Sequence, residues 1–309
     1  MDAQRLAADV MKGDRRAVAK AITLVENGGP KATTLLKKIG GRLGDAFVLG
    51  VTGPPGTGKS TLIDGIAELY RKKGLKVGII AIDPTSPLTG GALLGDRVRM
   101  VDLTEDRGVY IRSMASRGWA GGLSAAVSDV IQVMDAAGMD IVMVETVGIG
   151  QSDTDIIRVA HMVAVVLMPG MGDDVQASKA GLMEIGDLYV VNKGDLPGAD
   201  DTVVDLMSML KDRKGRSPSV LKASATRKQG LDAVVSTIEK TRAKFLSPSA
   251  ADGGHEMRLK SIRGMITERA RKKALEGLDE DDSRMGALAE KVAAHKVTID
   301  EAADALLAS

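Results

Sequence analysis

One short glycine-rich stretch constrains this chain more than any other feature. It reads G-x-x-x-x-G-K-S and lies between an apolar run of strand-forming residues, 47–52, and a segment with helical apolar spacing, 62–69. A strand, a glycine loop and a helix in this order indicate a phosphate-binding loop, although an ordinary glycine turn is the alternative. We expect Lys59 to reach the β- and γ-phosphates of a nucleotide and the Ser60 hydroxyl to bind Mg²⁺. The residues of the loop are Gly53, Pro54, Pro55, Gly56, Thr57, Gly58, Lys59, Ser60 and Thr61.

The composition excludes several classes of protein. Lys and Arg number 42 against 41 for Asp and Glu, which argues against a general nucleic-acid or acidic-membrane binder. The chain has no Cys, so disulfides, thiolate metal sites and cysteine nucleophiles are excluded. We find no apolar run near the roughly 18 residues of a membrane span and no signal-peptide pattern at the N-terminus. We therefore expect a cytoplasmic protein that binds neither nucleic acid nor a membrane.

The pattern of apolar segments predicts three parts. Residues 1–45 have helical spacing, residues 46–246 alternate strands with helices, and residues 247–309 begin with a linker and continue as helices. The alternation predicts an α/β fold of the P-loop NTPase class, with a mostly parallel central sheet flanked by helices and helical extensions at both ends. The predicted strands are 47–52, 77–82, 109–112, 141–145, 162–168, 188–192 and 219–223.

The C-terminal tail poses a packing question. Leu259, Ile262, Ile266 and Ala270 share one face of its first helix, and the tail is too small to bury that face alone. It either packs back on the main domain or forms a dimer arm, and we favour the dimer arm. Thr298 and Glu301 have the spacing of a capping box for a last short helix.

Acidic residues follow predicted strands, where ligands of parallel sheets bind. Asp83 follows one strand, Asp96 opens a helical segment after a Gly- and Pro-rich loop, and Glu145 ends a strand directly before Thr146-Val147-Gly148. We expect these three carboxylates to hold Mg²⁺ with Ser60, and the Gly148 N–H to contact the γ-phosphate. The alternatives are a turn or helix cap for Asp83 and Asp96, and an incidental strand-end acid for Glu145.

A second polar signal points to guanine. Asn192, Lys193 and Asp195 form N-K-x-D after a predicted strand. The Asp195 carboxylate can accept hydrogen bonds from the N1–H and the amine of guanine, whereas adenine has no matching pair of donors. Asn192 would brace the loop, and Lys193 would cover the ring. Alone the motif is only a polar turn, but after the two other motifs it favours GTP over ATP. A backbone N–H among Ser224, Ala225 and Thr226 would meet the guanine O6.

Four longer motifs resemble one known family. They are A-I-D-P-T-S-P at 81–87, T-G-G-A-L-L-G-D at 89–96, V-E-T-V-G-I-G-Q-S at 144–152 and M-P-G-M-G-D-D-V-Q at 168–176. With the nucleotide motifs, they resemble the MeaB/ArgK family of P-loop GTPases over nearly the whole chain. This resemblance implies a homodimeric GTP- and Mg²⁺-binding metallochaperone of an adenosylcobalamin-dependent acyl-CoA mutase, such as methylmalonyl-CoA mutase. Such a chaperone gates cofactor loading and protects or repairs its client.

The same resemblance assigns further roles. It places Asp83, Asp96 and Glu145 around Mg²⁺, and it makes residues 168–179 an extra switch that contacts the partner. Asp173 and Lys179 are then candidates for a coupling ion pair, with a solvated helix start as the alternative. Gly194 departs from the commoner Ala of the base-reading motif and leaves the expected base reading intact.

Hydrolysis is expected to be slow without the partner. Many GTPases place Gln directly after the switch glycine, but this chain has Ile149 there and Gln151 two positions later. One alternative function is a metal-insertion GTPase, which usually carries Cys or His clusters; this chain has only His161, His255 and His295. The others are a GTP-dependent kinase of a transport-binding protein and a non-catalytic nucleotide-gated scaffold.

Overall fold

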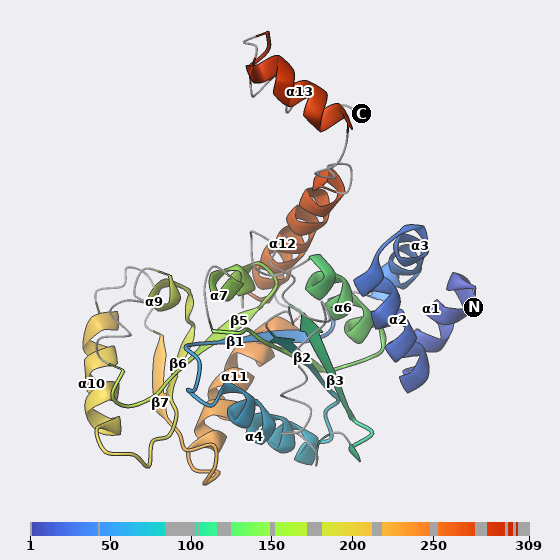
Figure 1. Ribbon diagram of the computed structural model, residues 1–309. Helices are drawn as coiled ribbons and strands as arrows, with labels where there is room; N and C mark the ends of the chain where they lie inside the picture. The colour runs from blue at the N-terminus through green and yellow to red at the C-terminus, as the bar shows by residue number, and fades with distance from the viewer. Residues whose placement is uncertain are drawn as a thin grey trace.

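A seven-stranded sheet forms the centre of the protein (Figure 1). The computed structural model describes residues 2–42, 44–83, 103, 105–115, 125–148, 152–171, 181–211, 218–247, 253–275, 283–293, 296–298 and 301. The strand order is β3-β2-β4-β1-β5-β6-β7, and every described pair is parallel. The strands are β1 (Phe47–Thr52), β2 (Val77–Asp83), β3 (Val109–Ala115), β4 (Ile141–Glu145), β5 (Met162–Leu167), β6 (Leu188–Val191) and β7 (Ser219–Lys222). The α/β prediction is confirmed.

The strand ends differ slightly from those predicted. β1 and β4 have the predicted bounds, whereas β3 continues three residues further than the apolar run suggested. Asp83 is the last residue of β2 and does not follow the strand, because it still pairs with Ala115 of β3. β5, β6 and β7 each end one residue before the predicted boundary, so Met168, Asn192 and Ala223 belong to the loops beyond them.

Helices cover both faces of the sheet. α4 (Lys59–Lys72) and α11 (Leu231–Leu246) share a core with Phe47, Leu49 and Val51 of β1. α6 (Ala125–Ala136) shares the opposite core with Val48, as expected from side chains that alternate along a strand. The same part of the chain contains the short elements η1 (Gly40–Arg42), α7 (Ser152–Asp155), η2 (Ile156–Arg158) and α9 (Leu182–Ile185), and the longer helix α10 (Ala199–Leu210).

Three N-terminal helices pack together and against α6. They are α1 (Ala3–Met11), α2 (Arg15–Asn27) and α3 (Pro30–Ile39). Asp2 caps α1 by accepting from the Gln4 N–H, and Asp14 caps α2 by accepting from the Ala17 N–H at 2.7 Å. Their buried residues include Val10, Ile22 and Leu35, so these helices extend the core on the α6 side.

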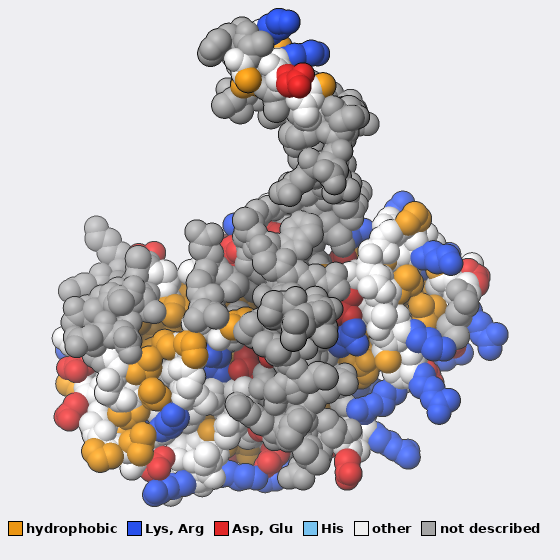
Figure 2. Space-filling model, viewed as in Figure 1, with side chains coloured by type: hydrophobic (Ala, Val, Ile, Leu, Met, Phe, Trp, Pro, Cys, Tyr) orange, Lys and Arg blue, Asp and Glu red, His pale blue; other side chains and the backbone are white. Residues whose placement is uncertain are grey.

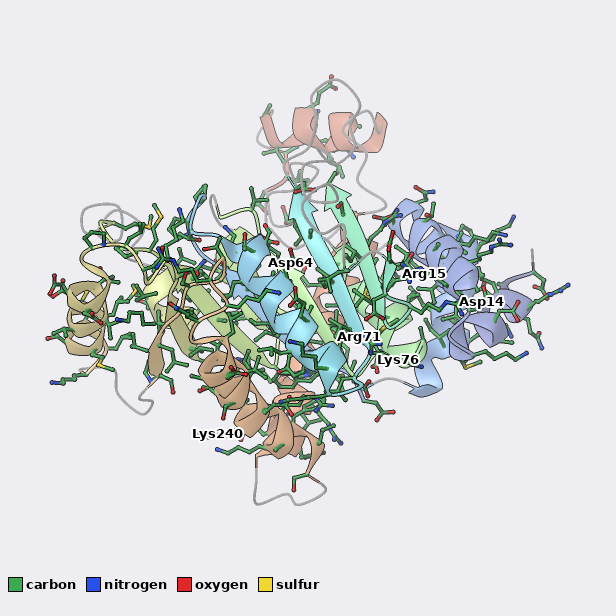
Figure 3. All side chains as sticks on the ribbon, turned by 90° about the horizontal axis from the view of Figure 1, so that it is seen from below. Asp14, Arg15, Asp64, Arg71, Lys76 and Lys240 are labelled. Carbon is green, nitrogen blue, oxygen red and sulfur yellow. The ribbon has the colours of Figure 1, made fainter. Side chains whose placement is uncertain are left out.

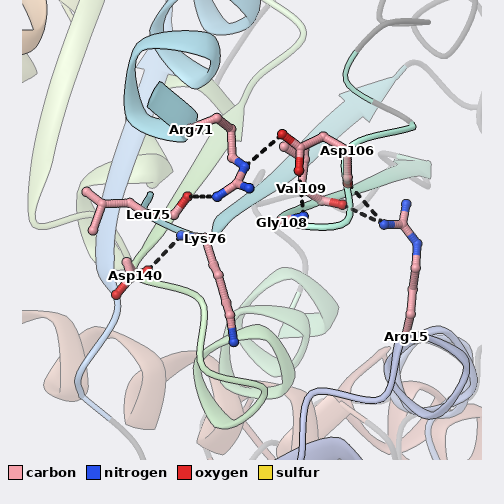
Figure 4. Close-up of polar contacts among 8 residues, drawn as sticks. All are labelled: Arg15, Arg71, Leu75, Lys76, Asp106, Gly108, Val109 and Asp140. Atoms are coloured by element: carbon pink, nitrogen blue, oxygen red, sulfur yellow. Dashed lines mark hydrogen bonds and ion pairs between the residues drawn. The ribbon is translucent and has the colours of Figure 1, made fainter. Parts of the chain in front are cut away.

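A polar cluster ties α2 and α4 to the turn before β3 (Figure 4). Arg15 Nη1 donates to the carbonyls of Asp106 at 3.3 Å and Val109 at 3.0 Å. Arg71 Nε donates to Asp106 Oδ2 at 2.9 Å, and the Gly108 N–H donates to Asp106 Oδ1 at 2.7 Å. The hydrogen bond from Arg71 is the largest cause of a lowered Asp106 pKa. Figure 3 shows Arg15 and Arg71 on their separate helices, so Asp106 links elements that are far apart in sequence.

The first C-terminal helix packs back on the domain through an unexpected face. α12 (Gly254–Leu275) contacts α6, α11 and η2, and within residues 254–270 its buried positions are Gly254, Ser261 and Glu268. The apolar face named from the sequence is not the face that packs on the domain, because Ile262 is 42% exposed and Ile266 is 62% exposed, and the favoured dimer arm stays a prediction. The contact of α12 with the domain has a steric requirement, since the backbones approach too closely for large side chains.

Glycines mark this close approach. A Cβ added at Gly264 would lie 1.8 Å from the Arg158 carbonyl oxygen, and one added at Gly254 would lie 2.2 Å from that of Lys244. α13 (Ser283–Ala293) lies beyond α12, away from the sheet (Figure 1). The capping box is confirmed, because the Glu301 N–H donates to Thr298 Oγ1 at 3.1 Å and the Thr298 N–H donates to Glu301 Oε2 at 2.8 Å. None of the described helices is long and apolar enough to cross a bilayer.

Candidate nucleotide-binding site

The glycine loop joins the C-terminal end of β1 to the start of α4, at the middle of the sheet. Its lysine is held over the loop, because Lys59 Nζ donates to the carbonyls of Gly53 at 2.8 Å and Pro54 at 3.2 Å. Thr57 Oγ1 also donates to the Pro54 carbonyl, at 2.9 Å. Lys59 is only 6% exposed, so its ammonium group lies inside the loop and needs polar partners there. Of the other loop residues, Gly53, Pro54 and Thr57 are buried, Gly58 and Ser60 are half-buried, and Pro55, Gly56 and Thr61 are exposed.

Two of the predicted Mg²⁺ ligands are in direct contact. Ser60 Oγ donates to Glu145 Oε1 at 2.8 Å, and Glu145 is 5% exposed. Glu145 pairs with Val51 of β1 on one side and with Ala81 of β2 on the other. Asp83 lies two residues beyond Ala81 on β2, so alternation places its side chain on the same face of the sheet as that of Glu145.

This oxygen set fits a Mg²⁺ ion bound with a nucleotide. The described residues contain no group of three or more His, Cys, Asp or Glu that could hold a metal alone. Mg²⁺ bound at nucleotide sites usually takes one or two protein carboxylates and completes its shell with phosphate oxygens and water. Ser60, Glu145 and Asp83 supply that kind of partial shell. Asp96 lies outside the described residues.

Gly148 packs directly on the phosphate loop. Its φ is +88°, and an added Cβ would lie 2.3 Å from the Gly53 carbonyl oxygen and 2.9 Å from Lys59 Nζ. The preceding Thr146 fixes this approach, because its N–H donates to the Val51 carbonyl at 3.1 Å and its hydroxyl donates to Thr52 Oγ1 at 2.8 Å. The segment after β4 therefore meets the loop at Lys59, and only glycine fits there.

One buried amide joins three loops. Asn192 Nδ2 donates to the carbonyls of Thr57 at 2.9 Å and Gly58 at 3.3 Å, and its Oδ1 accepts from the Ala225 N–H at 3.0 Å. Asn192 is 2% exposed. Gly58 has φ +84°, and a Cβ there would lie 2.6 Å from Asn192 Nδ2. The loops after β1, β6 and β7 are thus locked together by one side chain.

The contacts of the Asp195 carboxylate favour its charged form, which accepts hydrogen bonds. Its Oδ1 accepts from Ser224 Oγ at 2.6 Å, and its Oδ2 lies 3.3 Å from Arg227 Nη2. The Ser224 hydrogen bond, followed by the backbone N–H of Asp195 itself and the charge of Arg227, lowers the Asp195 pKa. Lys193 has a left-handed backbone, with φ +53°, and its Nζ lies 3.4 Å from Met168 Sδ. Sequence reasoning missed Arg227, because no motif marks an arginine three residues after Ser224.

The three predicted N–H donors for guanine O6 are not equivalent. The Ser224 N–H donates to the Gln229 carbonyl at 2.9 Å, and the Ala225 N–H donates to Asn192. Thr226 is exposed and occupies the second position of a turn closed by the Lys228 N–H and the Ala225 carbonyl at 3.2 Å. The Thr226 N–H makes no hydrogen bond with any of the described residues.

The predicted partner switch cannot be placed. Asp173 and Lys179 lie outside the described residues, as do Ile149 and Gln151. Met168 and Met171, at the start of this segment, are described, and Met171 is buried. The described part of the site therefore comprises the phosphate loop, Asp83, Glu145, Gly148 and the base-side loops.

Comparison with known proteins agrees with this geometry. The model of the family described as "Methylmalonyl Co-A mutase-associated GTPase MeaB" matches residues 18–277. A protein of Pyrococcus horikoshii is 52% identical over 244 residues, covering 77% of each chain. GTPase ArgK of Escherichia coli is 41% identical over 236 residues, covering 72% of this chain and 71% of its own. The crystal structure of a LAO/AO transport system kinase superposes with a TM-score of 0.72 at 27% identity, covering 98% of this chain and 96% of that one.

Proposed function

This chain belongs to the family of methylmalonyl Co-A mutase-associated GTPases, MeaB, and we propose that it acts as a Mg²⁺-dependent GTPase chaperone of an adenosylcobalamin-dependent acyl-CoA mutase. In this proposal the GTP-bound and GDP-bound states gate cofactor loading and the protection or repair of the client. The family match supports the client class, because its description names such a mutase. The observation that carries the nucleotide part is the contact of Gly148 with both the Gly53 carbonyl and Lys59.

Each phosphate-side residue has a role in this proposal. Lys59 Nζ would exchange its bonds to the Gly53 and Pro54 carbonyls for stronger, charge-assisted bonds to phosphate oxygens. The Ser60 hydroxyl, which donates to Glu145, would turn its lone pair to Mg²⁺, with Asp83, Asp96 and Glu145 nearby. The ion, when bound, neutralises charge on the phosphates. The Gly148 N–H would donate to a γ-phosphate oxygen, so loss of that phosphate would release the segment after β4.

The base-side residues would select guanine. The charged Asp195 carboxylate would accept from the guanine N1–H and amine, and Lys193 would cover the ring. Asn192 would transmit the position of the base to the phosphate loop through Thr57 and Gly58. Thr226 is the best candidate donor to O6, since Ser224 and Ala225 already donate their N–H groups.

The partner-facing features remain proposals from the sequence and the family. We propose that residues 168–179, with Asp173 and Lys179, respond to the client, and that residues 247–309 contribute to a homodimer. The division of the chain into an N-terminal extension, a GTPase domain and a C-terminal arm, with boundaries after residues 45 and 246, also stays a prediction. Ile149 stands where many GTPases have Gln, so we expect slow hydrolysis alone and faster hydrolysis when a client orders the switch segments.

The test is GTP turnover with and without purified methylmalonyl-CoA mutase. We expect a low rate alone and at least a roughly tenfold increase with the mutase, while the Lys59→Ala variant stays inactive in both cases. An unchanged rate, together with no co-elution of the two proteins, would refute the chaperone proposal. The kinase alternative is less favoured, because the relative from Escherichia coli is described as a GTPase. Transfer of labelled phosphate from GTP to a protein would revive that alternative.

A further inference from the structure

Apart from the candidate nucleotide site, a pocket lies at the opposite end of β1 from the phosphate loop. It is lined by residues of α6, α12 and the beginning of β1, and its volume is about 230 Å³. An apolar cavity of ~150 Å³ accepts benzene, whereas pockets for drug-sized ligands begin near ~300 Å³. The pocket therefore has room for a molecule of roughly six to twelve non-hydrogen atoms.

Most of the pocket wall is apolar. Val48 of β1 and Ile131 of α6 are fully buried behind it, and Met265 of α12 is half-buried. Ile262 and Ile266 of α12 lie on the solvent side, with 42% and 62% exposure. A ligand with a hydrocarbon body would cover these side chains and remove apolar surface from water.

Two neutral hydrogen-bond donors line the same pocket. His161 Nδ1 accepts from the Val48 N–H at 2.8 Å, so the neutral ring carries its proton on Nε2. Ser261 is 2% exposed and lines the pocket with its hydroxyl-bearing side chain. A buried hydroxyl and a fixed N–H favour a ligand with acceptor oxygens.

Three charged side chains line the pocket: Arg258, Arg269 and Asp135. Arg269 is paired with Asp129 at 3.1 Å and also donates to Thr33 Oγ1 at 3.1 Å. Asp135 directs its oxygens to the N–H groups of Gly44, at 2.6 Å, and Ala46, at 2.9 Å. Its carboxylate is therefore occupied by backbone donors.

Arg258 differs from Arg269. It donates to the Phe245 carbonyl at 2.8 Å and lies over the Phe245 ring at 4.8 Å. None of the described carboxylates forms an ion pair with it, and its buried Nε has no hydrogen-bond partner among the described residues. A guanidinium in this setting favours an anion with two acceptor oxygens.

We propose that this pocket binds a small monocarboxylate with an aliphatic or aromatic body. The carboxylate would meet Arg258, the His161 Nε2–H and the Ser261 hydroxyl, and the hydrocarbon part would lie against Ile131, Met265 and Ile262. This site is separate from the nucleotide site and goes beyond the proposed function. Bound there, the ligand would fasten α12 to α6 and β1.

The test uses hexanoate as the probe and hexanamide as its uncharged match. Binding is followed by the NMR signal of the Met265 methyl group in the full-length protein without nucleotide, with Met265→Leu to assign the signal. We expect a saturable shift with hexanoate and at least a tenfold weaker affinity for hexanamide. No saturable shift, or equal affinity for both probes, would overturn the proposal.

Variants locate the carboxylate. Arg258→Gln should weaken hexanoate binding at least tenfold, and Ser261→Ala should weaken it at least threefold. Arg263→Gln is the matched control, because Arg263 is an exposed arginine of α12 that does not line the pocket. If Arg258→Gln fails to fold, Ser261→Ala and the amide comparison still decide the matter. Equal affinity in Ser261→Ala and Arg263→Gln would contradict the assigned carboxylate position.

A side chain from a second copy of the protein is the competing occupant. In that case the Met265 signal would depend on protein concentration in the absence of hexanoate, and hexanoate would not shift it saturably. That result would overturn the proposal.

Discussion

Arg158 Nη1 lies 2.8 Å from Glu268 Oε1, and this ion pair fastens α12 to η2. Arg158 Nε also lies 3.1 Å from Asp155 Oδ1. Gly264 reinforces the junction by packing against the Arg158 carbonyl. Since η2 follows the segment that starts at Gly148, the C-terminal helix is anchored to the part of the chain that leaves the candidate γ-phosphate contact.

Breaking this pair should destabilise the protein. The Glu268 side chain is 7% exposed, so Arg158→Ala would leave a buried carboxylate without its partner. We expect a loss of about 1–3 kcal/mol in the free energy of unfolding, and a smaller loss for Glu268→Gln, which keeps a hydrogen bond. Urea unfolding measures both. The control is Lys222→Ala, whose pair with Asp200 is exposed at 41% and 83% and should contribute less than ~0.5 kcal/mol. Equal losses for Arg158→Ala and the control would show that the junction is unimportant.

Gly148→Ala should abolish the response to the γ-phosphate. The added Cβ would clash with the Gly53 carbonyl at 2.3 Å, and φ +88° disfavours alanine. We expect at least a roughly tenfold loss of kcat for GTP hydrolysis, because the segment after β4 could no longer reach Lys59. Gly138→Ala is a matched control, since Gly138 has φ +80° but no atoms within 4 Å of an added Cβ. It should lose about 1 kcal/mol of stability and keep its activity. Equal activity in the two variants would contradict the assigned role of Gly148.

Thr226→Pro tests the backbone donor to the base. Thr226 occupies the second position of the turn from Ala225 to Lys228, a position that accepts proline. Proline removes the N–H without removing the turn, so we expect guanine nucleotides to lose at least roughly tenfold in affinity, about 1.4 kcal/mol. Thr226→Ala keeps the N–H and should bind as the parent does. Unchanged GDP binding by the proline variant in calorimetry would exclude this N–H as the O6 donor.

His161 should make the protein sensitive to acid. Burial, followed by the nearby charges of Arg258 and Lys260, lowers its pKa to about 3 from the ordinary 6.5. The native state therefore binds fewer protons than the unfolded state between these values, and stability should fall as pH decreases from 6.5 toward 3. The contribution is at most about 1.4 kcal/mol per pH unit.

Two measurements check the histidine. The His161 Cε1 proton shift should stay constant between pH 5 and 8, and His161→Asn, which retains an acceptor for the Val48 N–H, should show a shallower loss of stability in acid. A His161 that titrates near pH 6.5 in the folded protein would contradict the burial argument.

Local patterns of apolar residues predicted the strands of the sheet well. They did not predict contacts between residues that are far apart in the sequence. The bounds of β1 and β4 follow from short apolar runs ended by Gly53 and by Glu145-Thr146, so sequence was sufficient there. The sequence did not predict which face of α12 packs on the domain, because the buried positions are small or polar and only their partners make burial favourable. Glu268 is 110 positions from Arg158, and no periodic pattern relates such residues.

The loops expected to bind the guanine base show the same difference between motifs, which were predicted, and long-range contacts, which were not. The N-K-x-D motif marked Asn192 and Asp195, but it could not show that Asn192 takes the Ala225 N–H and leaves Thr226 as the remaining donor. The contact of Arg227 with Asp195 could not be predicted for the same reason. Exposed apolar side chains on α10 and the loop before it, Leu196, Val204, Met207 and Met209, also carry no motif, and Figure 2 shows hydrophobic side chains gathered on this side of the molecule.

Calorimetric titration with GDP, GTP and ATP in the presence of Mg²⁺ tests the central claim most directly. The account predicts saturable binding of both guanine nucleotides, at least roughly hundredfold weaker binding of ATP, and loss of binding in Lys59→Ala. An absence of heat with guanine nucleotides, or ATP binding as tight as GTP binding, would contradict it.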